Sequence, residues 1–199
     1  MEKEKIIFAT GNIGKLKELE FLLSKNRLNI KLLSLNDLPA KPVIIENGST
    51  FIENAMIKAE TVFNMYKLPV IADDSGIIVE ELGEPGVFSA RYAAENASDE
   101  DNNKKLIKKV KSLKNKRAYF ECALVFIDKN GKIYNSTERC YGEIIDKPRG
   151  NKGFGYDPIF LIPELNKTMA ELELNEKNKI SHRGKAFKKL LNILRGIYG

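Results

Sequence analysis

Histidine, cysteine and long apolar runs are all scarce in this chain of 199 residues. The only histidine is His182, which excludes a metal site built from several histidines. The two cysteines, Cys122 and Cys140, lie in apolar, strand-like segments without metal-ligand spacing, a pattern that predicts reduced thiols in a protein core. No stretch approaches the roughly 18 consecutive apolar residues of a membrane span.

Targeting signals, repeats and low-complexity linkers are also absent. Residues 1–5 are mostly charged, and the apolar run that follows them is too short for a signal peptide. Neither an internal repeat nor a biased linker interrupts the sequence. We therefore expect one domain, or one domain with two lobes, over residues 1–199 in a soluble protein of the cytoplasm.

The net charge of +6, from 33 Lys and Arg against 27 Asp and Glu, suits a polyanionic partner. Nucleic acid and a nucleoside triphosphate both fit, and the net charge does not choose between them. The lysine-rich segment 102–116 could be a nucleic-acid patch. It is more simply the solvated face of a helix, because no RNA-binding aromatic motif accompanies it.

Strand-like and helix-like segments alternate along the chain, as in α/β folds. Strands are expected over residues 5–10, 30–33, 70–73, 77–79, 117–127 and 132–141. Helices are expected over residues 14–24, 51–66 and 99–113 and from 181 toward the end of the chain. Asn130 and Gly131 predict a tight hairpin. Parallel crossovers combined with this hairpin predict a mixed sheet flanked by helices.

The segment Asp73-Asp74-Ser75-Gly76 follows an apolar strand and is predicted to form an acidic turn before the next strand. Its carboxylates are the oxygen ligands that Mg²⁺ requires. A plain surface turn is the alternative. If the strand continues through both aspartates, they point to opposite sides, so only one of them faces a given pocket. We choose Asp74, which is nearer the turn.

The segment Thr10-Gly11-Asn12-Ile13-Gly14-Lys15 predicts a turn from the first strand into the first helix. Its glycines allow a phosphate to approach the backbone, the helix start offers N–H donors, and Lys15 adds a positive charge. These features form half of a phosphate cradle. The spacing is not that of a Walker A loop, which excludes a P-loop kinase. A glycine turn before a helix is also common in other α/β proteins.

Three further groups of residues are candidates. Glu53 fits a helix capping box after Thr50, whereas Lys58 could be solvated or could reach a phosphate. Phe154 offers a face for stacking a purine and Asp157 offers an acceptor, unless they form only a packed turn. His182 and Arg183 follow Ser181 at a helix start, where a neutral imidazole and a guanidinium make a donor-rich pocket.

Together these motifs resemble the inosine triphosphate pyrophosphatases, also called XTP/dITP diphosphatases, in order from Phe8 to about Leu190. The resemblance implies a two-lobed α/β fold with a mixed, elongated sheet and an active-site cleft between the lobes. It further implies a homodimer that needs Mg²⁺. The implied reaction cuts ITP, dITP and XTP between the α and β phosphates, which removes these purine nucleotides from the pool.

The resemblance also assigns roles to individual residues. Glu46 and Asp74 become metal ligands, and Asp74 is in addition the catalytic proton acceptor. Lys177 becomes a contact to the base. The substrate-binding set is Thr10, Gly11, Asn12, Ile13, Gly14, Lys15, Lys58, Ser75, Phe154, Gly155, Tyr156, Asp157, Lys177, His182 and Arg183. A related pyrophosphatase that acts on modified pyrimidine or methylated nucleotides would keep the phosphate and metal residues without needing residues 181–183.

Overall fold

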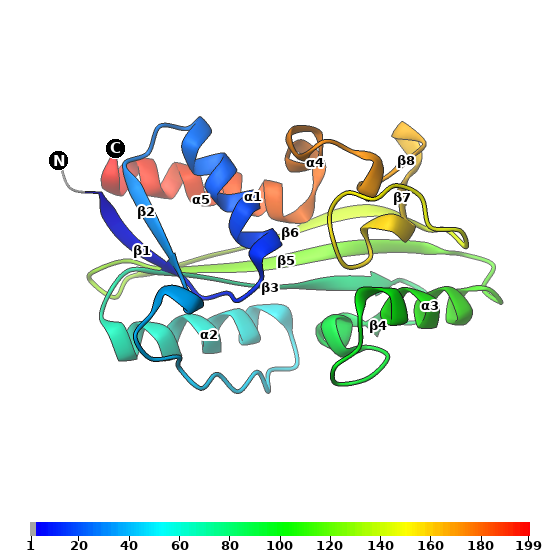
Figure 1. Cartoon of the computed structure of the whole chain (residues 1–199), viewed down its shortest axis with the longest axis horizontal. Coiled ribbons are helices and arrows are strands. Elements are labelled where there is room, and N and C mark those ends of the chain that lie inside the picture. Colours follow the sequence, from blue (N-terminus) through cyan, green and yellow to red (C-terminus); the bar gives the residue numbers. More distant parts are fainter. Residues whose placement is uncertain (1–2) are drawn as a thin grey trace. The chain divides into compact units, whose positions relative to one another are not determined.

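The computed structural model describes residues 3–199, which form one mixed β-sheet with helices beside it (Figure 1). The strands are β1 (Glu4–Phe8), β2 (Ile30–Ser34), β3 (Val70–Val79), β4 (Glu84–Pro85), β5 (Arg117–Ile127), β6 (Ile133–Ile144), β7 (Phe160–Ile162) and β8 (Lys167–Thr168). The α-helices are α1 (Ile13–Lys25), α2 (Phe51–Tyr66), α3 (Asp99–Val110), α4 (Leu174–Ile180) and α5 (His182–Tyr198). The predicted α/β class is confirmed.

The sheet has the strand order β2-β1-β3-β5-β6-β7-β8, with β4 paired to β3. Strand β1 pairs in parallel with both β2 and β3, and these pairings require the crossover helices α1 and α2. Strands β6, β7 and β8 pair antiparallel. The predicted mixture of parallel and antiparallel pairing is therefore correct. Among residues 3–199, no helix is long and apolar enough to cross a membrane.

The chain divides into two compact units. The first comprises residues 1–74, 122–138 and 183–199, and the second comprises residues 75–121 and 139–182. The boundaries cut strands β3, β5 and β6 and the junction between α4 and α5. The single two-lobed domain expected for residues 1–199 stays a prediction.

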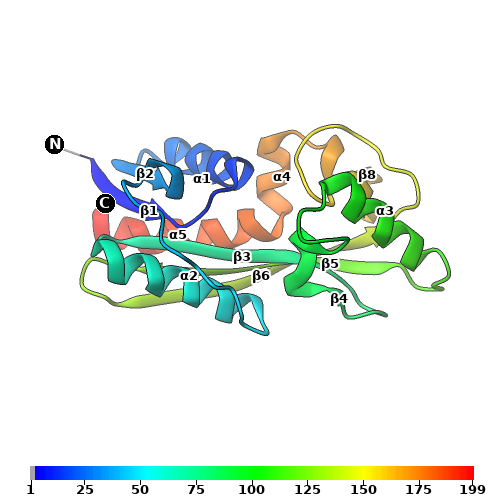
Figure 2. The ribbon, with the colours of Figure 1, turned by 60° about the horizontal axis from the view of Figure 1, so that its bottom comes forward.

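In the first unit, helices cover both faces of the sheet. Helices α1 and α5 lie on one face and α2 lies on the other (Figures 1 and 2). One apolar cluster joins α1 and α5 to the strands through Leu19, Phe187 and Leu190, together with Phe8 and Phe126. Coverage of both faces explains why the last three residues of β1 and the second half of β5 are continuously buried.

The second unit contains α3, α4, β4, β7 and β8. Its core packs α3 through Leu106 and Val110 against strand residues such as Ile77, Phe120 and Phe160. Helix α4 has only seven residues, and its pattern was too short to predict a helix. Ser181 therefore lies between two helices and is not simply the residue before the last one.

The predicted acidic turn is wrong, because β3 runs unbroken from Val70 to Val79 through both aspartates, Ser75 and Gly76. A turn would have exposed the two carboxylates to water. In the strand, each carboxylate instead meets a lysine from a different helix: Asp73 meets Lys15, and Asp74 meets Lys58. Because each carboxylate is paired with a lysine, it can lie within the strand and does not need to be hydrated in an exposed turn.

The two cysteines provide a test of the core. Cys122 is 0% and Cys140 is 4% exposed, and the two are not joined in a disulfide. Burial raises the pKa of the Cys122 thiol well above its ordinary value, which keeps it protonated and unreactive. We expect neither thiol to react with iodoacetamide at pH 8 in the native protein, and both to react in guanidinium chloride. Stoichiometric labelling without denaturant, measured by intact mass, would contradict this packing.

Candidate active site

The β1–α1 turn is fixed by two local hydrogen bonds. The Asn12 backbone N–H donates to the Thr10 Oγ1 at 3.0 Å, and the Lys15 backbone N–H donates to the Asn12 Oδ1 at 3.1 Å. Asn12 is thereby the N-cap of α1, while Gly11, Asn12 and Ile13 stay exposed. The first amides of a helix have no partners within the helix, so this exposed end can receive an anion.

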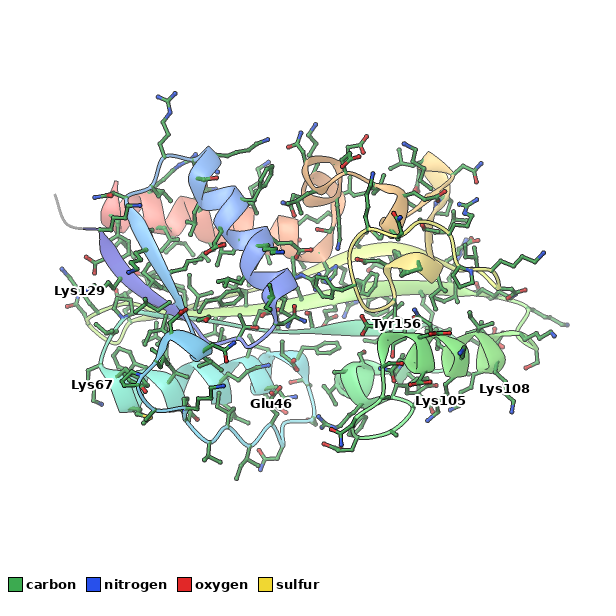
Figure 3. All side chains as sticks on the ribbon, viewed as in Figure 1. Glu46, Lys67, Lys105, Lys108, Lys129 and Tyr156 are labelled. Carbon is green, nitrogen blue, oxygen red and sulfur yellow. The ribbon has the colours of Figure 1, made fainter. Side chains whose placement is uncertain are left out.

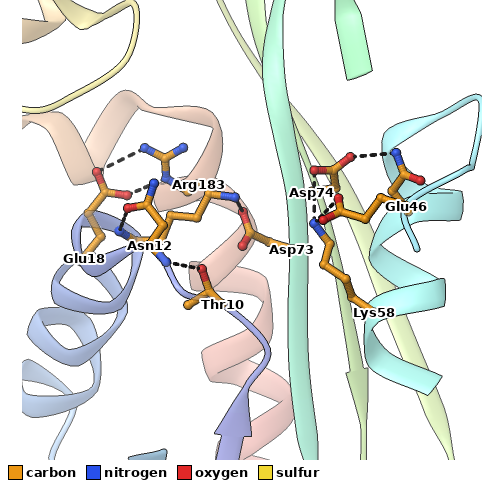
Figure 4. A network of polar contacts seen from close by, with 10 residues as sticks. Thr10, Asn12, Glu18, Glu46, Lys58, Asp73, Asp74 and Arg183 are labelled. Atoms are coloured by element: carbon orange, nitrogen blue, oxygen red, sulfur yellow. Dashed lines mark hydrogen bonds and ion pairs between the residues drawn. The ribbon is translucent and has the colours of Figure 1, made fainter. Parts of the chain in front are cut away.

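Lys15 reaches from this helix start to strand β3. Its Nζ lies 2.9 Å from the Asp73 Oδ2, and the Asp73 side chain is fully buried (Figure 4). Burial alone would raise the pKa of Asp73, but Lys15, Lys58 and Arg183 together bring that pKa below its ordinary value. Asp73 is therefore an anion that holds the Lys15 ammonium at the phosphate-cradle end of α1.

Asp74 lies on the opposite side of β3 from Asp73, as strand alternation predicts (Figure 4). The Lys58 Nζ is 3.2 Å from the Asp74 Oδ1 and 2.8 Å from the Glu46 Oε2. The Asn54 Nδ2 donates to the other Asp74 oxygen at 3.2 Å. Lys58 and Asn54 are four residues apart on α2, so both side chains come from one face of that helix.

The start of α2 holds Glu46 in place. Thr50 is the N-cap, and Glu53 accepts hydrogen bonds from the Ser49 and Thr50 backbone N–H groups, which confirms the predicted capping role of Glu53. The Gly48 N–H donates to the Asn54 Oδ1 at 2.8 Å. These bonds fold residues 48–50 onto the first turn of α2, just after Glu46 (Figure 3).

Charges in this cluster perturb one another. Burial raises the pKa of Asp74, and Glu46 and Asp73 raise it further, against the opposing effect of Lys58 and Lys15. Burial would lower the pKa of Lys58, but Asp74, Asp73 and Glu46 together raise it above its ordinary value. Lys58 is therefore a cation that contacts two carboxylates, those of Glu46 and Asp74, and that Asp73 stabilises from a greater distance.

The Glu46 and Asp74 carboxylates fit a divalent cation. Two carboxylate oxygens from different segments converge on one position of positive charge, which Lys58 Nζ occupies at 2.8 and 3.2 Å. Within residues 3–199, no cluster of three or more His, Cys, Asp or Glu side chains could hold a metal ion. Two carboxylates suit Mg²⁺, which is commonly held by one or two carboxylates together with waters and substrate phosphates.

In the second unit, the structure brings together Phe154, Asp157 and Lys177. The Lys177 Nζ is 2.6 Å from the Asp157 Oδ2, and both side chains are at most 5% exposed. The same Asp157 oxygen accepts the Phe154 backbone N–H at 3.0 Å. The Lys177 Nζ also lies 5.0 Å from the centre of the Phe154 ring. An aromatic face and a buried cation therefore lie beside each other in this unit.

The neighbouring residues of this loop are held by α3 and by the core. The Gly155 N–H donates to the Asp99 Oδ2 at 2.6 Å, and the Asn103 Nδ2 donates to the Gly155 carbonyl at 3.1 Å. Tyr156 is 5% exposed, and its hydroxyl donates to the Ser89 carbonyl at 2.7 Å. The Tyr156 side chain is thus part of the core, which leaves its backbone as the part that could meet a substrate.

His182 and Arg183 begin α5 and fall in different compact units. The His182 ring stacks on Phe120 with the ring centres 4.7 Å apart. The Arg183 guanidinium contacts the Glu18 carboxylate through Nε at 2.5 Å and Nη2 at 3.3 Å, and both side chains are buried. Glu18 therefore fixes the orientation of Arg183.

Sequence reasoning missed several partners of the predicted site residues. Asn54 is on the same predicted helix as Lys58 but has no role in the sequence analysis, Glu18 and Asp99 are not candidates there, and Asp73 is set aside in favour of Asp74. Asn54 could have been found from its spacing of four residues to Lys58. Glu18 sits beside Leu19 on α1, so a charged residue next to the buried face was the available signal. Ser75, which follows Asp74, is half-buried in β3.

The chain is similar to known proteins along most of its length. A model of the Ham1 family matches residues 6–193. The dITP/XTP pyrophosphatase of Geobacter sulfurreducens is 47% identical over 185 residues, which is 92% of each chain. The dITP/XTP pyrophosphatase of Geobacillus kaustophilus is 46% identical over 190 residues, covering 94% of this chain and 92% of that protein.

Solved structures of Ham1 proteins also match this chain. The HAM1 protein from Coxiella burnetii superposes with a TM-score of 0.88 at 39% identity, covering 97% of this chain and 99% of its own. The Ham1 protein of Staphylococcus aureus gives a TM-score of 0.86 at 39% identity with the same coverage. The resemblance inferred from the motifs is confirmed. With a match over residues 6–193 and relatives 46–47% identical along most of their length, the chain belongs to the Ham1 family.

Proposed function

We propose that the chain hydrolyses non-standard purine nucleoside triphosphates, namely ITP, dITP and XTP, to the monophosphate and pyrophosphate. The observation that carries the proposal is the convergence of Glu46 and Asp74 on Lys58, within 3.2 Å of its Nζ. Such a cluster suits a polyphosphate that arrives with a divalent cation. The relatives named dITP/XTP pyrophosphatase support the choice of substrate.

The first unit handles the phosphates in this proposal. The exposed amides at the start of α1 and the Lys15 ammonium bind phosphate oxygens, and Lys58 neutralises charge on the opposite side of β3. Glu46 and Asp74 hold Mg²⁺, which when bound would screen the triphosphate charge and lower the pKa of an attacking water. Asp74 accepts the proton of that water, and Asn54 orients the Asp74 carboxylate through its hydrogen bond.

The second unit reads the base. Phe154 stacks on the purine, and the Lys177 ammonium, already beside that ring, donates to a 6-oxo group. His182 adds a donor within this unit, and Arg183, which belongs to the first unit, adds a further donor, as the motif predicts. A 6-amino group would present donors to donors and leave buried groups unpaired, so adenine is disfavoured.

The proposal also includes a Mg²⁺ requirement, which the Glu46 and Asp74 carboxylates support. It further includes the homodimer that the resemblance implies and the cytoplasmic location expected from the sequence. A nucleic-acid-binding role is less favoured, because three of the four lysines of α3 already have partners. Lys104 pairs with Glu100, Lys105 donates to the Tyr92 carbonyl, and Lys109 pairs with Glu84.

The activity is tested by measuring pyrophosphate release from a panel of ITP, dITP, XTP, ATP, GTP and modified pyrimidine triphosphates. We expect release from the 6-oxopurine substrates ITP, dITP and XTP, with a strict need for a divalent cation. Preference for the modified pyrimidines would instead support the related pyrophosphatase.

Asp74→Asn should nearly abolish turnover. The amide cannot accept a proton and is a weaker ligand for a cation, so we expect a loss of at least ~10²-fold in kcat. Asp146→Asn is the matched control, since Asp146 pairs with Lys116 and its side chain is 50% exposed. Retention of more than half the activity at saturating Mg²⁺ in Asp74→Asn would refute the assignment.

Lys15→Ala should raise KM for every triphosphate by a similar factor, about 10-fold, because a charged hydrogen bond to phosphate is lost without any contact to the base. Lys17→Ala removes an exposed lysine from the same helix and should change nothing. Thermal unfolding of the wild type and of Lys15→Ala shows whether loss of the Lys15–Asp73 ion pair also lowers the stability of the fold. A changed ratio of ITP to ATP activity with unchanged KM would count against the cradle.

Lys177→Met should reduce the preference for ITP over ATP. Methionine keeps the length and apolar character of the side chain but removes the donor, so kcat/KM should fall at least ~10-fold more for ITP than for ATP. Lys179→Met, an exposed position on the same helix, is the control. Equal proportional losses for the two substrates would place the selectivity elsewhere.

A further inference from the structure

Helix α3 binds the proposed base-binding loop at the backbone of one residue, Gly155. Gly155 donates its N–H to the Asp99 Oδ2 at 2.6 Å and accepts from the Asn103 Nδ2 at 3.1 Å. Both hydrogen-bonding groups of one residue are therefore taken by side chains from one face of α3, since positions 99 and 103 are four residues apart. The orientation of this glycine is fixed from outside its own loop.

Gly155 is a residue whose conformation needs such support. Its φ is +62°, in the left-handed region, and among residues 3–199 no heavy atom beyond its chain neighbours lies within 4 Å of where a Cβ would be. Packing on the Cβ side therefore does not hold it, and a glycine has the widest choice of backbone conformations. The two hydrogen bonds from α3 supply the restraint that packing does not.

The neighbours of Gly155 carry the proposed base contacts. Phe154 precedes it, and the Phe154 N–H is bound to the same Asp157 oxygen that pairs with Lys177. The Gly153 backbone also packs closely against this Asp157 oxygen, because a Cβ on Gly153 would lie 2.0 Å from it. Rotation of the peptide that joins Phe154 to Gly155 would therefore move the Phe154 ring, whose centre lies 5.0 Å from the Lys177 Nζ, away from that lysine.

We infer that Asp99 and Asn103 are positioning residues for purine recognition, which act by clamping Gly155 and so preorganising Phe154 for stacking on the base. The inference rests on the proposed function, because it takes Phe154 as the base-stacking residue. It assigns to the first turns of α3 a role beyond folding. Neither residue needs to touch the substrate.

Asp99 is the better position to test, because it is exposed whereas Asn103 is 7% exposed. Asp99→Ala removes the acceptor for the Gly155 N–H. Asp99→Asn keeps an acceptor oxygen but loses the charge, and Glu100→Ala removes a neighbouring charge from the same helix turn. All three variants lose one negative charge near the N-terminus of α3, so they are matched in charge. Only Asp99→Ala also loses the oxygen that accepts the Gly155 N–H.

We expect Asp99→Ala to raise KM for ITP about 5-fold, with kcat within about 2-fold of wild type, since one charge-assisted hydrogen bond outside the reacting centre is lost. Asp99→Asn and Glu100→Ala should stay near wild type. Inhibition by tripolyphosphate, which has no base, should be unchanged in Asp99→Ala. Unchanged KM in Asp99→Ala, or an equal loss in Glu100→Ala or with tripolyphosphate, would overturn the inference.

A second measurement does not depend on activity. Hydrogen exchange of the Gly155 amide should be faster in Asp99→Ala than in wild type and should be restored in Asp99→Asn. If the wild-type protein releases no pyrophosphate from ITP, the proposed function fails. If it does, but Gly155 exchange is the same in all variants, the clamp alone is refuted.

Discussion

Burial of two consecutive carboxylates in strand β3 is the constraint on which the rest of the first unit depends. Asp73 and Asp74 point to opposite sides of the strand, so each needs its own positive partner. Helix α1 supplies Lys15 on one side, and helix α2 supplies Lys58 on the other. These two ion pairs offset the cost of burying the carboxylates. They also place the Lys15 ammonium beside the N-terminus of α1 and the Lys58 ammonium beside the carboxylates of Glu46 and Asp74.

The two compact units divide the proposed chemistry between them. Glu46, Asp74, Lys15 and Lys58 all belong to the first unit, and Phe154, Asp157, Lys177 and His182 belong to the second. The chain crosses between the units four times, at Asp74–Ser75, Glu121–Cys122, Glu138–Arg139 and His182–Arg183. Charged groups for phosphate and groups for a base are thus built on separate cores.

Much of the fold was predictable because its signals are local. Hydrophobic periodicity, the capping box at Thr50 and Glu53 and the hairpin at Asn130 and Gly131 each act over a few residues. Partners distant in sequence were not predictable. The pairing of Glu18 with Arg183 joins residues 165 apart, and the continuous β3 depends on lysines from two helices, so neither follows from local pattern.

Buried ion pairs are weak evidence of stability, since the desolvation of two charges offsets much of their attraction. This chain nevertheless buries Lys177 with Asp157 and Arg183 with Glu18, and it places Lys15 and Lys58 on carboxylates. Replacing a buried ion pair with well-packed apolar residues is often neutral or stabilising in proteins. The common property of these ion pairs is that each fixes a cation or a donor before any ligand arrives. Groups that are already oriented need no reorganisation when a charged substrate binds. The ion pairs are therefore better explained by preorganisation of the site than by stabilisation of the fold.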